Sequence, residues 1–595
     1  MSNRVCSVLV KLTALSVFLV SAVAAGCSGD GRGTGASGGT TATVTATSTT
    51  GTDTATVTAT STTGTGTVSV TATETVTVST TATVTASSTA TATGTGTGAP
   101  LGCSATADGI CPTGCVKNND PDCPDCSGAA DCEDGNASTI DRCVSGGCTH
   151  DAIAGKIYYV DPVSGDDSSG TGSASAPFKT IGRIRPQLQT GDAVLLRSGD
   201  YGAYLENQAN LGFTDWVTIA AAPGAEPRFT SITLQAAGSS FSGNADLYMR
   251  FVGLTATDGI VVNGWRHVEV LDCKVRRVGP WAGSAADVDK TAIAAAFTSY
   301  LLVEGCDITE TGIGIQVQRS ENATVRRNHI YLITQDGLEI CSVKQGLVEG
   351  NRIHNMDDGV DDDSGLDWNR HGDGIQLYPI FNNGPEDRNE SITIRGNIFY
   401  ELDNAAIQFN SKSNAFSQNI IIENNILGPA RANPFNSYDE QIDGLTLRNN
   451  SVIYIPGGLT FQSRFRTLTD DDFTVEMSGT GHTNVQIYNN IFVNDVYRLA
   501  LSNVTRYDHN VCIYSPGAGS GLGCERTAAQ GSLKVTDNQY LHPMNFDGVL
   551  IANSPAINAG TRTQPNGDPI ADYYNYDIYG RQRDAQPDIG AVEMP

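Results

Sequence analysis

One polar residue recurs along the second half of this 595-residue chain at nearly regular intervals. Each copy is an asparagine followed by an apolar or β-branched residue, and the copies are Asn328, Asn351, Asn397, Asn425, Asn450, Asn490 and Asn510. Several intervals are about 20 to 28 residues, and the two longer ones leave room for an extra coil or a loop. Periods in this range indicate a solenoid, in which each coil buries its apolar face only against its neighbours. We expect the asparagine amides to stack at the turns and to bond along the solenoid axis.

A second repeat lies beside the first, in four short segments with alternating apolar and polar residues. The segments are 314–317, 337–340, 374–377 and 406–409. Alternation of this kind places Ile and Leu inside a β-structure and the polar residues outside. The polar members, Gln316, Glu339, Gln376 and Gln408, should therefore form an outward row on one sheet. Together the two repeats predict an all-β fold, a right-handed parallel β-helix.

The charge balance of the chain is strongly acidic. Lys and Arg total 37 against 64 Asp and Glu, a formal net charge of −27 at pH 7. No basic surface is available to neutralise phosphates, so we expect no nucleic-acid partner. The excess of carboxylates suits a secreted protein, which we expect to be a monomer, and leaves oxygen ligands for hard cations.

The first residues have the layout of a signal peptide, residues 1–26. An apolar run, Val8 to Ala25, follows Arg4 and ends in small residues. The sequence Ala-Ala-Gly-Cys ending at Cys27 resembles a lipobox, which implies cleavage before Cys27 and its lipidation; ordinary secretory cleavage is the alternative. Residues 27–100 are almost all Thr, Ala, Gly, Ser and Val, so we expect an extended, disordered tether. The protein is expected to be exported and lipid-anchored at the outer membrane or cell surface, or else secreted.

Residues 101–151 form a cysteine-rich module. Its eight cysteines are Cys103, Cys111, Cys115, Cys123, Cys126, Cys132, Cys143 and Cys148. An even count in a short exported segment predicts a disulfide framework, and half of a zinc site at Cys123 and Cys126 is the alternative. Farther along, we expect Cys512 and Cys524 to pair. Two others, Cys273 and Cys306, should be stacked buried thiols, with a disulfide as the alternative.

Residues 152–595 carry a family resemblance at both ends. Tyr158–Asp161, Ala176–Ile181 and Leu195–Tyr201 resemble the N-terminal capping rung of the pectate-lyase-like β-helix superfamily, with a helix that closes the first coil. Ser554–Thr561 and Pro587–Glu593 resemble a common C-terminal segment of β-helices. The resemblance implies that the whole region from residue 152 to the end is one β-helix domain.

Acidic residues concentrate between Asp336 and Asp387. When 358–361 is aligned with 336–339, Asp361 falls in the outward row, and Asp336 and Asp358 stack one coil apart. Carboxylates this close repel unless a cation lies among them, and oxygen ligands alone favour Ca²⁺. The alternative is a solvated acidic loop.

The same stretch resembles the calcium-dependent pectate lyases of the ninth polysaccharide lyase family. Asp357, Asp358 and Asp361 match the family's Asp-Asp-Gly-x-Asp motif, and Asp336 matches the Asp of its preceding coil. The resemblance implies these four residues as Ca²⁺ ligands. The family's catalytic base is a Lys on a later coil, where this chain has Gln376. Glutamine cannot take a proton, so another base is required.

Two substitutes for that base are present. Lys344 lies in a segment that resembles the Lys-bearing strand of the sixth lyase family, the alginate and chondroitin lyases. Arg370 and His371 resemble that family's Arg-His-Gly, although the two segments do not fall in its relative register. An imidazole beside carboxylates can titrate near neutral pH, so His371 is the second candidate. Solvated or structural roles are the alternatives for Lys344 and His371.

These residues predict a surface-tethered protein that acts on acidic polysaccharide, most simply a calcium-assisted lyase. β-Elimination needs a cation or Arg370 to neutralise the uronate carboxylate, and a base to remove the neighbouring proton. We expect Trp368, Gln376 and Tyr378 to contact the sugar. A polygalacturonase-like hydrolase would instead use Asp373 with another acid, and a uronan epimerase would use related chemistry. The non-enzymatic alternative is a carbohydrate-binding or adhesive solenoid.

Overall fold

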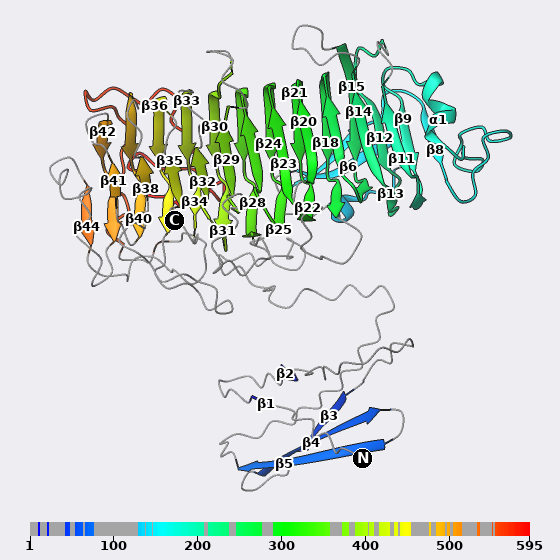
Figure 1. The fold of residues 1–595 in the computed structure, drawn as a ribbon, viewed down its shortest axis with the longest axis horizontal. Helices are drawn as coiled ribbons and strands as arrows, with labels where there is room; N and C mark the ends of the chain where they lie inside the picture. The colour runs from blue at the N-terminus through cyan, green and yellow to red at the C-terminus, as the bar shows by residue number, and fades with distance from the viewer. Residues whose placement is uncertain are drawn as a thin grey trace, which may run out of the picture. The chain divides into compact units, whose positions relative to one another are not determined.

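The computed structural model describes most of the chain after residue 125. The described residues are 126, 129–136, 138–144, 147–207, 212–236, 245–276, 290–356, 372–379, 387–402, 404–409, 416–428, 434–437, 441–453, 475–477, 483–493, 497–499, 504–513, 532–535, 550 and 554–594, with the backbone of five strands before residue 76. The chain divides into two units, Met1–Gly98 and Ala99–Pro595 (Figure 1).

The first unit contains short antiparallel strands. Two strands, β1 (Val10–Lys11) and β2 (Ser21–Ala22), pair with each other. A three-stranded sheet is formed by β3 (Ala42–Thr47), β4 (Thr54–Thr63) and β5 (Gly66–Thr75). The alternation of Thr with Ala and Val in these strands is a composition and period that suit β-structure. The extended, disordered tether expected for residues 27–100 stays a prediction.

The second unit is built from three long parallel sheets. Sheet 1 comprises β8 (Ile157–Val160), β9 (Ala193–Leu196), β12 (Val217–Ala221), β15 (Ala245–Val252), β18 (Trp265–Leu271), β21 (Ser299–Glu304), β24 (Glu321–Arg326), β27 (Lys344–Glu349), β30 (Glu390–Arg395), β33 (Phe416–Glu423), β36 (Gln441–Arg448), β39 (Val485–Tyr488) and β42 (Val504–Asp508).

Sheet 2 comprises β10 (Gly199–Asp200), β13 (Pro227–Phe229), β16 (Thr255–Ala256), β19 (Lys274–Arg276), β22 (Asp307–Thr311), β25 (His329–Ile333), β28 (Arg352–Met356), β31 (Ile398–Tyr400), β34 (Ile426–Leu427), β37 (Ser451–Ile453), β40 (Ile491–Val493), β43 (Val511–Ile513) and β44 (Leu533–Val535). Sheet 3 comprises β11 (Ala203–Glu206), β14 (Ser231–Gln235), β17 (Ile260–Asn263), β20 (Thr291–Ala296), β23 (Ile313–Gln318), β26 (Leu338–Cys341), β29 (Ile375–Tyr378), β32 (Ile407–Phe409), β35 (Phe435–Ser437), β38 (Val475–Met477) and β41 (Tyr497–Leu499).

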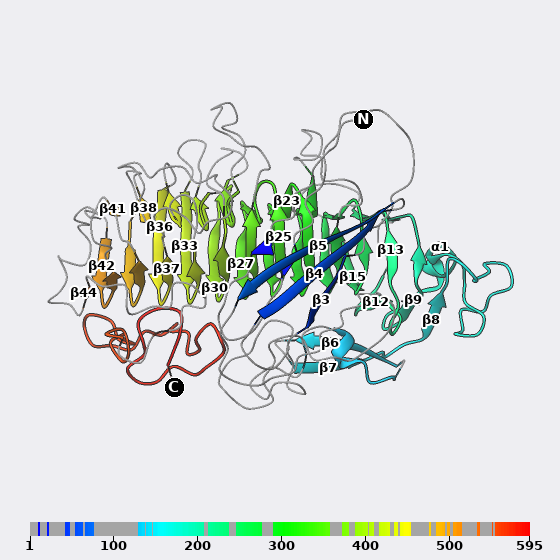
Figure 2. The same cartoon turned by 90° about the horizontal axis from the view of Figure 1, so that it is seen from below.

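From β9 to β43, successive strands of the chain belong in turn to sheet 1, sheet 2 and sheet 3. The chain runs through β24, β25 and β26, and then β27 returns to pair in parallel with β24. The three sheets therefore lie side by side along one axis, as Figures 1 and 2 show. The prediction of a right-handed parallel β-helix is confirmed.

The core is a stack of identical positions on successive coils. Ile315, Leu338, Ile375 and Ile407 are register neighbours on sheet 3, and all are fully buried. Gly337 precedes one of them and must be glycine, because an added Cβ would lie 2.7 Å from the carbonyl oxygen of Gly374. Protein interiors are packed as densely as crystals of small organic molecules, so the contact between these two coils leaves no room for a side chain at residue 337.

The expected asparagine ladder is confirmed along its whole length. The amide of Asn397 donates to Asn425 Oδ1 at 3.0 Å and to the carbonyl of Val348 at 3.0 Å. Its own Oδ1 accepts from the backbone and side-chain nitrogens of Asn351, both at 2.9 Å. Equivalent bonds join the other members, Asn328, Asn450, Asn490 and Asn510. Each buried amide is thereby satisfied by the next coil.

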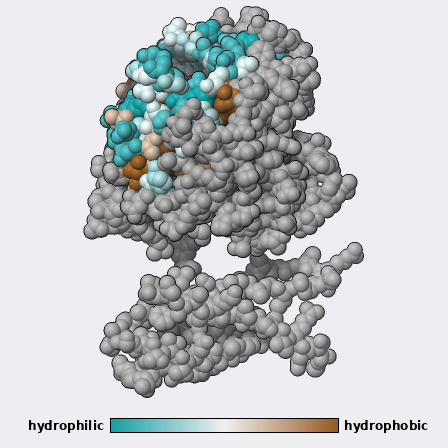
Figure 3. All heavy atoms as spheres, turned by 90° about the vertical axis from the view of Figure 1, so that its left-hand side faces the viewer, coloured by the Kyte–Doolittle hydropathy of each residue, from teal (hydrophilic) through white to brown (hydrophobic). Residues whose placement is uncertain are grey.

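The N-terminal end of the solenoid is closed by a helix, and a C-terminal segment packs on its side. At the N-terminal end, α1 (Ile181–Ile184) is capped by Thr180 and buries Ile181 and Ile184, followed by the 3₁₀ turn η2 (Arg185–Gln187). At the other end, residues 554–594 run along the side of the last coils. Buried Arg583 donates to Glu593 Oε2 at 3.2 Å and to Asn424 Oδ1 at 2.8 Å, which ties this segment to sheet 1. Seen from that end, the described residues are mostly hydrophilic (Figure 3).

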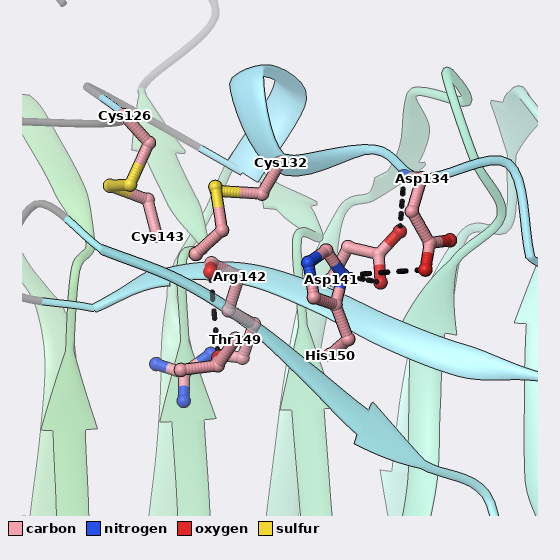
Figure 4. Close-up of a disulfide and its surroundings, with 9 residues drawn as sticks. Cys126, Cys132, Asp134, Asp141, Arg142, Cys143, Thr149 and His150 are labelled. Carbon is pink, nitrogen blue, oxygen red and sulfur yellow. Dashed lines mark hydrogen bonds and ion pairs between the residues drawn. A yellow bond between two sulfur atoms is a disulfide. The ribbon is translucent and has the colours of Figure 1, made fainter. Parts of the chain in front are cut away.

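The cysteine-rich module contains a disulfide-linked hairpin. The 3₁₀ turn η1 (Ala129–Cys132) precedes the antiparallel strands β6 (Thr139–Val144) and β7 (Gly147–Ala152). Disulfides join Cys126 to Cys143 and Cys132 to Cys148 (Figure 4). The zinc alternative is therefore wrong for Cys126, whose sulfur is already bonded. The first four cysteines of the module lie outside the described residues.

The hairpin packs on the outward face of sheet 1. Ile140 lies in one apolar cluster with the outward row formed by Leu195, Ala220, Val252 and Leu271. Arg142 lies 3.0 Å from Asp272 and 3.2 Å from Glu304, which belong to successive coils. Figure 2 shows the hairpin and the C-terminal segment along the same side of the solenoid.

The remaining cysteine predictions can be compared with the structure. Cys273 and Cys306 are free, buried thiols, as expected. Cys512 is disulfide-bonded, and its expected partner Cys524 lies outside the described residues. Within the part of the chain that the structure describes, no helix is long and apolar enough to span a bilayer.

Candidate functional site

A group of buried acids lies at the entrance of two neighbouring strands of sheet 3. The pairing of Leu338 with Ile375 places Asp336 and Asp373 at equivalent positions on successive coils. The next outward position of each strand holds Glu339 and Gln376, which are direct register partners. All four side chains are buried, although they lie on the outer side of the sheet.

The predicted outward row is confirmed as a continuous ladder. Gln316, Glu339, Gln376 and Gln408 are register partners on β23, β26, β29 and β32. The amide of Gln316 donates to Glu339 Oε2, and the hydroxyl of Tyr378 donates to the same oxygen at 3.0 Å. A hydrogen bond also joins the carboxyl groups of Glu339 and Asp336. Glu339 is therefore the centre of the polar network.

Asp373 is held from two directions. Its Oδ1 accepts from the backbone nitrogen of Ala405 at 2.9 Å, on the following coil. The side-chain nitrogen of Gln408, in the orientation that satisfies its neighbours, donates to both carboxylate oxygens of Asp373 at 3.2 Å. The backbone nitrogen of Asp373 donates to Asp336 Oδ1 at 3.2 Å. The carboxylates of the two coils are thus linked through the backbone.

Burial determines the electrostatics of this cluster. Desolvation, and then the neighbouring Asp336 carboxylate, raises the pKa of Glu339 from 4.5 to about 7. Desolvation also raises the pKa of the Tyr378 hydroxyl and of the Cys341 thiol, so both stay protonated at neutral pH. Glu339 is thus the group that can gain or lose a proton near neutral pH.

The expected position of Asp361 in the outward row is wrong. The strand that pairs with β26 is β29, so Gln376 follows Glu339 directly in the row. By the same pairing, the stacking partner of Asp336 on the next coil is Asp373 and not Asp358. The physical reason is that two Asp-Gly segments compete for one strand, and 373–378 supplies the apolar residues that complete the core.

The structure places Lys344 on a different sheet from the acidic cluster. Lys344 begins β27 of sheet 1, where its register neighbours are Glu321 and Glu390. This ladder of alternating charge is the environment of a structural surface lysine. Lys344 as the base remains a prediction, but its sheet does not bring it into the row that holds Glu339.

Several predicted site residues lie outside the described part of the chain. These are Cys27, Asp357, Asp358, Asp361, Trp368, Arg370 and His371, and their roles remain predictions. Residues 357–371 connect β28 to Gly372, the residue before Asp373. The expected contact of Tyr378 with the sugar also stays a prediction; its hydroxyl donates to Glu339 Oε2 at 3.0 Å.

Sequence reasoning missed the proton-binding role of Glu339. The available signal was its spacing from Asp336, since residues three apart at a strand entrance can bring their carboxyl groups together. The burial that raises the pKa of Glu339 could not be predicted from neighbouring residues in the sequence.

Comparisons with known proteins agree with the observed fold. A family model described as a right-handed beta helix region matches residues 196–381 and 258–452. These residues of the chain form a right-handed β-helix region. No curated protein sequence matches the chain.

Solved structures with similar folds include three proteins that bind or modify carbohydrates according to their names. XylC in complex with xylose is 10% identical, with a TM-score of 0.39, over 74% of this chain and 98% of that chain. Pectate lyase Pel9A is 16% identical, with a TM-score of 0.31, over 74% and 97%. The A-module of the mannuronan C-5 epimerase AlgE6 of Azotobacter vinelandii is 14% identical, with a TM-score of 0.35, over 60% and 93%.

Proposed function

We propose that this protein is a surface-tethered enzyme that acts on acidic polysaccharide by calcium-assisted β-elimination at uronate residues. The observation that carries the proposal is the buried group of three carboxyl side chains, Asp336, Glu339 and Asp373. They lie on the outward side of sheet 3, at the entrances of two adjacent strands. Three carboxyl groups buried this close together repel one another when ionised, so a group of this kind favours a bound cation or a retained proton.

A calcium ion fits the chemistry of these ligands. Asp336 supplies carboxylate oxygens, and the predicted ligands Asp357, Asp358 and Asp361 belong to the segment that ends one residue before Gly372. All are hard oxygen donors, which Ca²⁺ prefers. Calcium bound there would neutralise the uronate carboxylate and acidify the adjacent C–H bond.

Proton transfer has a described candidate in Glu339. With a pKa of about 7, its carboxyl can accept a proton as carboxylate and return it as acid at neutral pH. Its hydrogen bonds from Gln316 and Tyr378 hold the carboxyl in one orientation. We therefore add Glu339 to the predicted bases Lys344 and His371, with Arg370 as the group that pairs with the uronate.

The same geometry disfavours a hydrolase that uses Asp336 and Glu339 as its two acids. Glycosidases place their catalytic carboxyl groups at least about 5 Å apart, so that a sugar or a water fits between them. The carboxyl groups of Asp336 and Glu339 are in hydrogen-bond contact. Asp373 with an acid outside the described residues is the remaining pair for hydrolysis.

A second candidate function is non-catalytic carbohydrate binding. The observation that favours it is the outward amide row, in which Gln316, Gln376 and Gln408 flank the single acid Glu339. Amides hydrogen-bond sugar hydroxyls without any proton transfer. In this alternative the Asp cluster has a structural role only.

The test is to incubate the full chain with pectate, alginate and glycosaminoglycans, with calcium or with chelator. The measurement is ultraviolet absorbance of the unsaturated uronate that elimination produces. We expect a calcium-dependent rise on one substrate class, and a loss of at least about 100-fold in kcat for Glu339→Gln. The control is Glu349→Gln, which changes a charge on the outward row of sheet 1.

Three results would contradict parts of the proposal. No rise on any substrate, with the polysaccharide retained, would favour the binding alternative. Reducing ends without unsaturated product would indicate hydrolysis. Elimination that is unchanged in Glu339→Gln would return the role of base to Lys344 or His371.

A further inference from the structure

Two imidazole side chains on the outer side of sheet 2 approach each other through their Nε2 atoms. His329 begins β25, and His354 lies in the middle of β28 on the next coil. Their Nε2 atoms are 2.8 Å apart. Both side chains are half-buried, so solvent reaches the pair.

The other nitrogen of each ring is already engaged by an acceptor. Nδ1 of His329 lies 3.2 Å from a carboxylate oxygen of Asp307, and Nδ1 of His354 donates to the amide oxygen of Asn355. Carboxylate and amide oxygens only accept hydrogen bonds, which favours the tautomer with the proton on Nδ1 in each ring. In that tautomer both Nε2 atoms present lone pairs toward each other, whereas a proton on either Nε2 makes the contact a hydrogen bond between the two rings.

Two facing lone pairs at this distance repel unless something positive lies between them. A proton shared by the two rings would be one solution, and a metal ion would be another. Burial, opposed by the bond to Asn355, lowers the pKa of His354 to about 4, so this ring stays neutral at physiological pH. Neutral imidazole is the form that binds metal ions.

The ring planes are held in place by stacking. His354 stacks on Tyr400, with ring centroids 4.4 Å apart, and on Tyr331, at 5.6 Å. The plane of His354 lies within 9° of parallel to each of these two rings. Since a metal ion binds in the plane of an imidazole, stacking fixes the direction in which Nε2 of His354 can coordinate.

We propose that His329 and His354 form a binding site for a divalent transition-metal ion, Cu²⁺ or Zn²⁺, which bridges two coils through the two Nε2 atoms. Metal–nitrogen distances of about 2.0 Å in a tetrahedral site require the nitrogens to separate to roughly 3.3 Å. His329, whose side chain is 44% exposed, would have to rotate away from His354 to open this gap. Water completes the coordination, and Asp307 and Asn355 orient the rings from behind, as outer partners of metal-binding histidines do.

This site is chemically distinct from the calcium site proposed above. Its ligands are imidazole nitrogens, which select Cu²⁺ and Zn²⁺ over the hard Ca²⁺ ion. It also lies on sheet 2, whereas Asp336, Glu339 and Asp373 lie at strands of sheet 3. Its failure or success therefore leaves the proposed enzymatic function untouched.

The test is titration of the metal-free full chain with Cu²⁺ and with Zn²⁺, followed by calorimetry and, for Cu²⁺, electron paramagnetic resonance. We expect one site with nitrogen hyperfine coupling that is lost in His329→Gln and in His354→Gln. Asp307→Asn should weaken binding by about tenfold, the lower end for an outer partner. Excess Ca²⁺ should not compete.

A matched control exists elsewhere in the solenoid. His267 stacks between Tyr248 and Tyr300, and its Nδ1 lies 2.8 Å from Asp246, but it has no second imidazole before it among the described residues. His267→Gln should leave the site intact. If the wild-type chain and His354→Gln bind the same number of ions with the same affinity, the proposal is wrong, and the pair is held by a shared proton alone.

Discussion

The carboxyl groups of Asp336 and Glu339 share a hydrogen bond at the entrance of β26, while Gln316 and Tyr378 both donate to Glu339. Two acids in contact cannot both ionise cheaply, so one of them holds a proton unless a cation replaces it. Under the proposed function, the proton and calcium would therefore be alternative occupants of one cluster. This competition gives the candidate site measurable behaviour before any substrate is known.

Glu339 should make the stability of the fold depend on pH. Its folded pKa is raised from 4.5 to about 7, so between these values the folded chain keeps a proton that the unfolded chain releases. The stabilisation is complete below pH 4.5 and is lost as pH rises to about 7. Glu339→Gln should remove this dependence and be more stable than wild type above pH 7, by up to about 3 kcal/mol. Denaturant unfolding across this pH range measures it, and parallel curves for the two proteins would exclude the effect.

Calcium binding should depend on the acidic motif rather than on acidity in general. Asp358→Ala combined with Asp361→Ala is expected to abolish calcium binding, because both are predicted ligands. Asp362→Ala combined with Asp363→Ala removes the same charge from the same run and is the matched control. Calorimetry at neutral pH would also detect protons released from Glu339 as the ion enters. Equal calcium affinity in both double variants would remove the metal hypothesis.

Asn397→Ala should destabilise the solenoid by about 3 kcal/mol or more. The substitution removes three donated and two accepted hydrogen bonds, and it leaves the buried amide of Asn351 without its acceptor. Asn566→Ala, at an exposed turn, is the control and should change stability by less than about 0.5 kcal/mol. Thermal unfolding of both variants provides the comparison, and similar melting temperatures would show that the ladder contributes little.

Arg142→Ala should release the hairpin from sheet 1. Arg142 pairs with Asp272 and Glu304, and burial already raises the pKa of Asp272. Removing one partner from a buried ion pair costs about 3 kcal/mol, because the other charge stays buried. Hydrogen exchange of β6 and β7 should accelerate. Arg276→Ala, which removes a more exposed pair with Glu310, should leave that exchange unchanged.

Cys27→Ser should convert a membrane-bound protein into a soluble exported one if the lipobox resemblance is correct. The cysteine thiol is the only group at that position that can carry the lipid. Fractionation of cells and mass spectrometry of the N-terminus would measure this change. Cys6→Ser, within the same signal peptide, is the control. An anchored Cys27→Ser protein would show that attachment has another origin.

The coils could be predicted because they repeat. The sequence contains two local signals, the period of Asn328, Asn351 and Asn397 and the alternation around Gln316. These signals are sufficient for the coils because each coil contacts only its neighbours. The register beyond residue 356 could not be predicted in the same way. Segments 358–361 and 373–376 both begin with Asp-Gly, so the local pattern fits either one. Pairing of Ile375 with Leu338 on one side and with Ile407 on the other decides between them.

The hairpin contact and the acidity of Glu339 were equally invisible in the sequence. Arg142 and Asp272 are separated by 130 residues and belong to no repeat. The pKa of Glu339 depends on how completely the outward side of sheet 3 is covered, which no alternation of residue types encodes. The sequence thus predicts where the polar residues lie but not which of them hold protons.

The ion pairs of Arg142 with Asp272 and Glu304, on two successive coils, have a mechanical consequence. The disulfide-linked hairpin is fixed to several coils of sheet 1, because Arg142 pairs with residues at the ends of β18 and β21 and Ile140 packs on the apolar row that begins at Leu195. A pull on the hairpin would therefore be shared among several coils and would not fall on the terminal strand β8 alone.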